Sequence, residues 1–144
     1  MSTLIAPATG RRQLGRSTIA VLAAIIANAV LSLGVDQALH VLGVYPPWGQ
    51  AMYEPSLNLL ALSYRIVFAV MSGYLVARLA PREPMRHAAI LGIIAVILSA
   101  LGAVVAITQA DLGPAWYPVA LAIVSFPCVW FGAVLDGQRA GQSA

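Results

Sequence analysis

Four long apolar segments dominate the sequence and limit what it can fold into. Each is close to the roughly 20 residues that an α-helix needs to cross about 30 Å of hydrocarbon. Of the 144 residues, 60% are hydrophobic and only 9% are charged, which is unusual for a soluble domain. Because backbone polar groups must be satisfied locally in lipid, we predict an all-α protein, a four-transmembrane-helix antiparallel bundle. The predicted spans are residues 18–39, 57–79, 87–108 and 114–135.

Arginine counting predicts the orientation of these spans. We expect one membrane domain, residues 17–135, between tails at 1–16 and 136–144. The loops 45–56 and 109–113 contain no arginine and carry Glu54 and Asp111 instead. Both termini are therefore predicted to be cytoplasmic, and a bias this one-sided argues against dual-topology insertion. The arginines on the predicted cytoplasmic side are Arg11, Arg12, Arg16, Arg78, Arg82, Arg86 and Arg139.

The first apolar segment has a second interpretation. The run RRQLGR, followed by an apolar core and Ala27-Asn28-Ala29, has the three-part form of a secretory signal peptide. The apolar run nevertheless continues through VLSLGV, past the expected cleavage site, and no soluble domain follows it. We therefore favour an uncleaved first span.

Several function classes lack the residues that they require. The formal charge of +3 is spread along the chain, so no basic stripe follows a nucleic-acid backbone and no nucleic-acid partner is predicted. Cys128 is the single cysteine, and His40 and His87 are expected at opposite membrane faces. These residues make no recognisable metal, haem or disulfide pattern. We predict no metal, no cofactor and no enzymatic activity, since a lipid-modifying enzyme would also need a nucleophile and base.

An arginine interrupts the second apolar segment. Arg65 lies within residues 58–77, where an ionisable side chain is costly and marks a functional site by default. On the first span, Asn28, Ser32, Asp36 and His40 recur every four residues and share one helix face. Asp36 and Arg65 should lie at comparable depth in the outer third of the membrane, so we expect them to pair.

The role of that pair has more than one explanation. An Arg–Asp pair can simply fix the register of two helices, and an arginine near an interface can reach water without any partner. Alternatively, the pair belongs to a ligand or ion site. Residues expected near the same level complete a candidate outer pocket, whose members are Arg65, Asp36, His40, Tyr64, Asn28 and Ser32.

The loop after the first span predicts a cap over this pocket. The stretch VYPPWGQAMYEPS contains three prolines and the aromatic residues Tyr45, Trp48 and Tyr53. Aromatic side chains of this kind suit the membrane interface, where the ring lies among headgroups and the polar tip meets water. We expect a stiff cap at the outer end of the bundle.

Small residues recur at four-residue spacing on the second and third spans and permit close helix packing. Gly73 is one of these small residues on the second span, and Gly92 is one on the third span. Because the turn APREPMR is short, we predict that these two spans form a tight hairpin with their small faces in contact. Pro127, within the fourth span, should bend that helix.

Three stretches carry a family resemblance: YRIVFAVMSGYLVARLAPREPMRHA, with VYPPWGQ before it and GPAWYP after it. Together they resemble a group of small four-helix bacterial membrane proteins of unassigned function, over residues 36–135. The resemblance implies a bacterial inner-membrane location. It implies nothing about mechanism.

Two function hypotheses follow from the sequence. In the first, the chain is an interaction or accessory protein that packs through its small-residue faces onto a second copy or a larger membrane complex. In the second, it is a small transporter, channel or sensor that holds an anion or small solute in the outer pocket. The sequence favours the first, because the inner half of the spans is almost wholly apolar. The lipid bilayer is the common partner of both.

Overall fold

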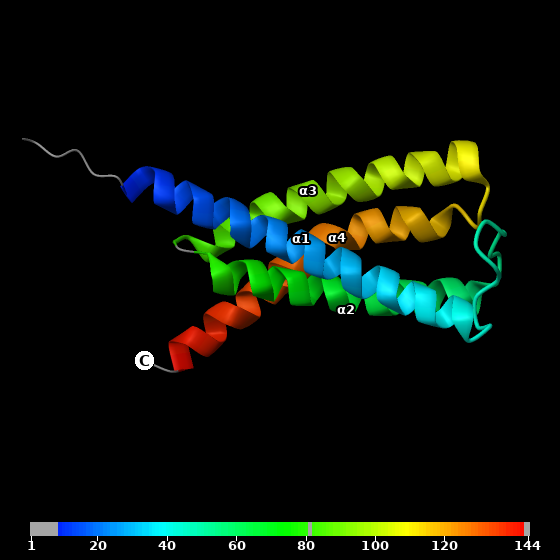
Figure 1. Cartoon of the computed structure of the whole chain (residues 1–144), viewed down its shortest axis with the longest axis horizontal. Helices are drawn as coiled ribbons and strands as arrows, with labels where there is room; N and C mark the ends of the chain where they lie inside the picture. The colour runs from blue at the N-terminus through cyan, green and yellow to red at the C-terminus, as the bar shows by residue number, and fades with distance from the viewer. Residues whose placement is uncertain (1–8, 81, 143–144) are drawn as a thin grey trace, which may run out of the picture.

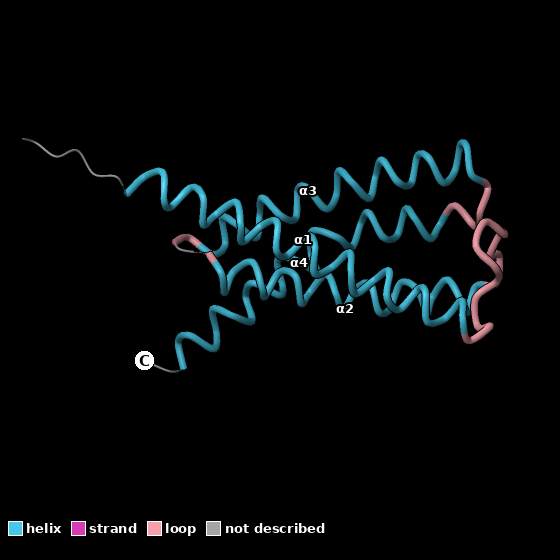
Figure 2. The backbone as a smooth tube through the Cα atoms, viewed as in Figure 1, coloured by secondary structure: helices cyan, strands magenta, loops and turns pink. Residues whose placement is uncertain are grey.

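The computed structural model is a bundle of long helices (Figures 1 and 2). It describes the backbone of residues 9–80 and 82–142, and over these ranges it contains helices and no strand. Four helices are long and apolar enough to cross a membrane, which confirms the predicted fold class. The elements in chain order are α1 (Thr9–Val41), α2 (Pro55–Leu79), α3 (Pro84–Val105), a short π-helix η1 (Ala106–Ala110) and α4 (Trp116–Gln142).

Prolines and a residue with left-handed backbone conformation mark several helix ends. Pro55 opens α2 and Pro84 opens α3, positions where the missing proline N–H costs no hydrogen bond. Asp111 follows η1 with a φ of 41°, in the left-handed region that ends helical geometry. All four helices extend beyond the predicted spans. The extension is largest in α1, which begins at Thr9, and in α4, which continues to Gln142.

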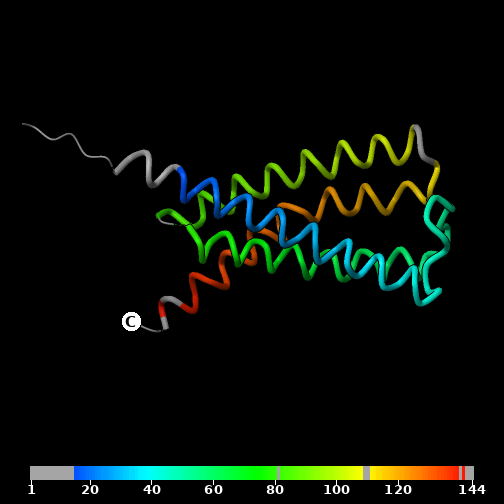
Figure 3. The backbone as a smooth tube through the Cα atoms, in the orientation of Figure 1, coloured from blue at the N-terminus to red at the C-terminus, as the bar shows by residue number. Residues whose placement is uncertain are grey.

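The two ends of the bundle differ in construction. One end carries the α1–α2 loop, residues 42–54, and the α3–α4 loop, residues 111–115; we call it the cap end. The opposite end carries the short α2–α3 turn, with the blue part of α1 and the red part of α4 in Figure 3 on the same side of the bundle. We call it the hairpin end.

Helix α4 packs against both α2 and α3, with glycines at the closest approaches. A Cβ at Gly73 would overlap the Val129 carbonyl oxygen, and a Cβ at Gly132 would overlap the carbonyl oxygen of Val70. A Cβ at Gly92 would lie 2.7 Å from the Phe126 ring. The predicted contact between the small faces of the second and third spans is therefore wrong at Gly73 and Gly92, because α4 occupies both positions.

A compact core of small side chains fills the hairpin half of the bundle. All four helices contribute to it, and two of its members, Ala24 and Val76, have no exposed surface. Small residues permit close backbone approach, which is the main source of helix association in lipid. Pro127 lies inside α4, and Figure 1 shows that helix changing direction along its length. The core residues are Ala20, Ala24, Val76, Ala77, Ala88, Leu91, Val129 and Ala133.

Candidate functional site

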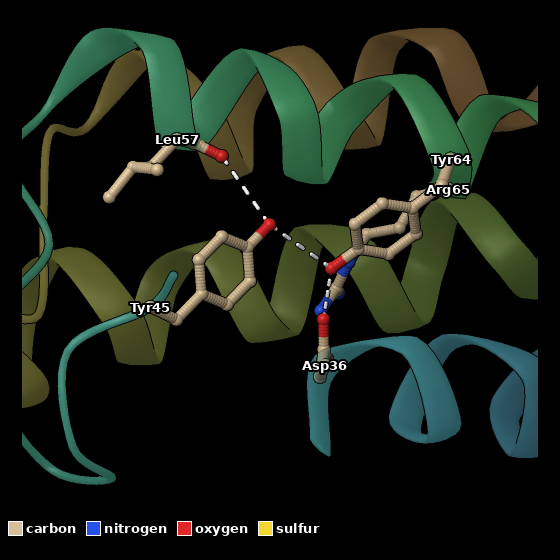
Figure 4. A network of polar contacts seen from close by, with 5 residues as sticks. All are labelled: Asp36, Tyr45, Leu57, Tyr64 and Arg65. Atoms are coloured by element: carbon tan, nitrogen blue, oxygen red, sulfur yellow. Dashed lines mark hydrogen bonds and ion pairs between the residues drawn. The ribbon is translucent and has the colours of Figure 1, made fainter. Parts of the chain in front are cut away.

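The predicted ion pair is present between α1 and α2 (Figure 4). Nη2 of Arg65 donates to Oδ2 of Asp36 at 2.6 Å, while the Tyr64 hydroxyl donates to Oδ1. The Asp36 side chain is 10% exposed and that of Arg65 is 29% exposed. Both carboxylate oxygens of Asp36 are thus occupied, and its charge is balanced by the neighbouring guanidinium.

Tyr45 connects this pair to the cap. Its hydroxyl lies 3.4 Å from the Leu57 carbonyl oxygen and 3.5 Å from the Tyr64 hydroxyl, as Figure 4 shows. Burial raises the pKa of Tyr45 above its ordinary value, so the phenol stays protonated and able to donate. The chain from Leu57 through Tyr45 and Tyr64 to Asp36 therefore ties the first loop to the ion pair.

His40 supports the cap and has no hydrogen bond to the ion pair. Its Nδ1 donates to the Pro46 carbonyl oxygen at 2.7 Å, and its ring lies 3.9 Å from the Trp48 ring, centroid to centroid. The Trp48 indole N–H in turn donates to the Gln37 side chain at 3.1 Å. These contacts hold the Pro-Pro-Trp segment against the end of α1.

The two loops at the cap end are joined to one another. The Met52 amide donates to the Leu112 carbonyl oxygen at 2.7 Å, and the Tyr53 hydroxyl donates to Oδ1 of Asp111 at 2.6 Å. The hydrogen bond to Asp111 raises the pKa of Tyr53, because it stabilises the protonated phenol beside a carboxylate. Tyr53 itself is exposed, so it acts here as a surface tie between loops.

A cavity lies beneath these loops. Its volume is about 300 Å³, and we call it the cap cavity. Arg65 and Asp36 line it from the helices, His40 and Trp48 line it from the cap side, and Tyr117 lines it from α4. Of the predicted pocket residues, Arg65, Asp36 and His40 therefore share this cavity, whereas Tyr64 contributes through its bond to Asp36.

Asn28 and Ser32 line a different cavity, deeper in the bundle. This second cavity has a volume of about 400 Å³, and Asp36 and Arg65 line it too. Serines from the other three helices face it; they are Ser72, Ser99 and Ser125. We call it the serine cavity. The sequence alone does not reveal this set, because the three serines lie on three different helices and only the fold brings them together.

Arg65 is the cationic group on the two cavities. A guanidinium has five N–H donors. Among the described residues, the hydrogen bond to Asp36 is made by Nη2, and no group accepts from the buried Nε. Arg65 therefore keeps N–H donors that a ligand with acceptor atoms can use.

A second arginine–aspartate pair lies toward the hairpin end. Nη1 of Arg78 is 3.6 Å from Oδ1 of Asp136, which is within ion-pair range but too long for a hydrogen bond. Nearby, Arg139 donates to the Tyr74 hydroxyl at 3.4 Å. Asp136 is buried within α4, although the sequence analysis assigned it to the C-terminal tail.

In the described part of the chain, no three His, Cys, Asp or Glu side chains lie close enough together to hold a metal ion. Cys128 is half-buried in α4. No protein-family model, curated protein or solved structure matches the sequence. The geometry around Arg65 therefore carries the argument about function.

Proposed function

We propose that the chain is a small membrane binding protein, of the transporter, channel or sensor class, that holds a small anionic or acceptor-bearing solute in the cap cavity. The observation that carries this proposal is Arg65, whose side chain lines the cavity, is 29% exposed, and makes one hydrogen bond, through Nη2 to Asp36, among the described residues. A volume of about 300 Å³ is at the lower end of ordinary small-molecule sites. We propose no catalytic role.

The location of the cavity in the cell follows from the arginine distribution. We place the protein in a bacterial inner membrane with the cap end toward the periplasm, because the arginines flank the helices at the hairpin end. Reporter fusions after Gly10, Pro84 and Gly141 should then give cytoplasmic signals, and fusions after Gln50 and Leu112 periplasmic signals. A periplasmic signal at Pro84 would contradict this orientation.

Binding is tested by the fluorescence of Trp48, which lies on the cavity wall. In a background with Trp116→Phe and Trp130→Phe, the purified protein in nanodiscs is titrated with sodium acetate, succinate or phosphate. At least one anion should change the emission in a saturable way, and Arg65→Gln should abolish the change. Arg78→Gln, the matched control, removes an equal charge outside the cavity and should leave the titration intact. Identical responses of the parent and Arg65→Gln would reject the proposal.

The interaction or accessory protein remains a second candidate, and one observation favours it. Gly34 of α1 and Gly102 of α3 lie on outward faces, where an added Cβ would meet nothing within 4 Å. Internal packing therefore does not account for a glycine at either position. If these faces contact a second copy or another membrane protein, Gly34→Leu or Gly102→Leu should reduce the associated mass in native mass spectrometry. Unchanged mass would leave this candidate without support.

A further inference from the structure

The serine cavity occupies a particular place along the bundle. Asp36 and Arg65 line both the serine cavity and the cap cavity, so the ion pair lies between the two. Toward the hairpin end, the serine cavity is bounded by core residues, since Ala24, Leu91 and Val129 belong both to its lining and to the core. The Asp36–Arg65 pair is therefore the boundary that the serine cavity shares with the cap cavity.

Three of the four serine hydroxyl groups on this cavity, those of Ser72, Ser99 and Ser125, have already committed their protons. Ser72 donates to the Ala69 carbonyl oxygen at 2.9 Å, and Ser125 donates to the Leu121 carbonyl oxygen at 2.6 Å. Ser99 and Ser125 oxygens are 3.1 Å apart, so Ser99 is the donor in that bond. The serine oxygens keep lone pairs that accept hydrogen bonds.

Asn28 adds an unsatisfied amide to the same lining. Its Oδ1 is buried and has no hydrogen-bond partner among the described residues. An amide in this position is costly in an apolar medium unless an occupant of the cavity bonds to it. Either orientation of the amide leaves one polar atom that needs a partner.

These groups define the chemistry of an occupant. The accepting serine oxygens require O–H or N–H donors, and an alkyl chain supplies none. The charge of Asp36 is already balanced by Arg65, and both of its oxygens are bonded, so the lining presents no spare charge. A neutral solute with several hydroxyl or amide groups fits these conditions, and about 400 Å³ accommodates one.

We propose that the serine cavity is a second binding site, for a small neutral solute rich in hydrogen-bond donors such as a polyol, and that the solute reaches it from the cap cavity when the Asp36–Arg65 pair separates. This inference rests on the proposed function in one respect, the access of solutes to the cap cavity. The ion pair then acts as a gate between two sites with different ligand chemistry.

Cysteine accessibility tests the inference in the full-length protein. In a Cys128→Ala background, Ser99→Cys places a thiol on the serine cavity, and Leu101→Cys places one on the exposed, lipid-facing side of the same helix. Each variant, in nanodiscs, is treated with 2-hydroxyethyl methanethiosulfonate, which is small, neutral and polar. Ser99→Cys should react, molar glycerol should slow that reaction, and Leu101→Cys should stay unreactive because thiolate does not form in hydrocarbon.

A second pair of variants tests the gate. Adding Tyr64→Phe removes one hydrogen bond from Asp36 and should raise the Ser99→Cys rate on the order of tenfold, the equivalent of one charge-assisted bond. Ser32→Cys, on the opposite wall, should behave in the same way and covers the case in which Ser99→Cys fails to fold.

Ala106→Cys, on the cap cavity, separates the two proposals. If Ala106→Cys reacts while Ser99→Cys and Ser32→Cys match Leu101→Cys even with Tyr64→Phe, the serine-cavity site is refuted and the cap-cavity function stands. If Ala106→Cys is also unreactive, the cap cavity is closed to solutes and both proposals fail. Glycerol-insensitive labelling of Ser99→Cys would reject polyol binding.

Discussion

The two arginine–aspartate pairs of this bundle contain the same residue types but differ in distance and in exposure to solvent. Arg65 and Asp36 join α1 to α2 by a 2.6 Å hydrogen bond, with side chains that are 29% and 10% exposed. Arg78 and Asp136 join α2 to α4 at 3.6 Å, and the Arg78 side chain is 62% exposed. An arginine near a helix end reaches water, whereas one in mid-span needs a partner.

The helix interfaces that contain these pairs also differ. At the α2–α4 interface, Gly73 and Gly132 bring the backbones together, so close packing holds the helices whether or not the ion pair forms. The described glycines of α1 make no such approach to α2, because Gly15 and Gly34 are exposed and have nothing within 4 Å of their Cβ positions. The comparison teaches that α4 packs through its glycines, whereas α1 is held by the small side chains of Ala20 and Ala24 toward the hairpin end and by its ion pair toward the cap end.

The largest effect is expected at the Asp36–Arg65 pair. Asp36→Leu or Arg65→Leu alone leaves one charge buried between helices and should lower the free energy of unfolding by about 3–5 kcal/mol. The double variant should lose less, because the two apolar surfaces can pack. Unfolding in mixed micelles, followed by circular dichroism, measures this double-mutant cycle.

The corresponding cycle at Arg78 and Asp136 is the control for that experiment. Because Arg78 is mostly exposed, its coupling to Asp136 should be about 0–1 kcal/mol. Equal coupling energies for the two pairs would show that depth in the bundle does not separate them.

The next largest effect concerns the glycines of α2 and α4. Gly132→Ala places a Cβ on the Val70 carbonyl oxygen and should destabilise the protein by about 1–3 kcal/mol through overpacking. Gly102→Ala is the matched helical control, since its Cβ meets nothing, and it should be neutral or slightly stabilising. If both substitutions were tolerated alike in thermal unfolding, the α2–α4 contact would not be the stabilising one.

Removing single tyrosine hydroxyls should give smaller and unequal effects. Tyr64→Phe takes away a donor to the buried Asp36 carboxylate and should cost about 1–2 kcal/mol. Tyr74→Phe removes a weak 3.4 Å contact with the exposed Arg139 and should change stability by less than about 0.5 kcal/mol. The same unfolding assay compares them, and a larger loss for Tyr74→Phe would reverse the ranking of the two regions.

The smallest effect is a pH dependence at the cap end. The pKa of Tyr53 is raised above 10.0 by its bond to Asp111, so the stabilising contribution is complete below about pH 10 and is lost as the pH rises through the raised pKa. The difference in unfolding midpoint between the parent and Tyr53→Phe should therefore be positive at neutral pH and disappear in alkali. A difference that persists unchanged at high pH would mean that the loop tie does not depend on the phenol proton.

The number and type of helices were predictable from sequence because hydropathy and length reflect the bilayer directly. Which helices contact one another was not predictable from the sequence. Small faces on the second and third spans indicate that some helix approaches closely, but the pattern does not identify it, and α4 proved to contact both Gly73 and Gly92. A short turn makes two helices sequential neighbours without making them the closest partners.

The same distinction applies to the site. Asp36 and Arg65 could be matched because rise per residue fixes their depth, and depth is the coordinate that a membrane constrains. Ser72, Ser99 and Ser125 share a cavity through the rotation of three separate helices, which hydropathy does not encode. Asp136 was assigned to the tail because a charge usually ends an apolar span, yet α4 continues through it.

The position of α4 bears on how the bundle is assembled during synthesis. Helices leave the ribosome in chain order, and the helix that contacts both α2 and α3 emerges after both of them. Until it inserts, the glycine surfaces at Gly73 and Gly92 face lipid without their partner. The bundle is therefore completed only once α4 has been synthesised and inserted, and a nascent chain truncated before residue 116 would present unfilled helix surfaces to the quality-control proteases of the membrane.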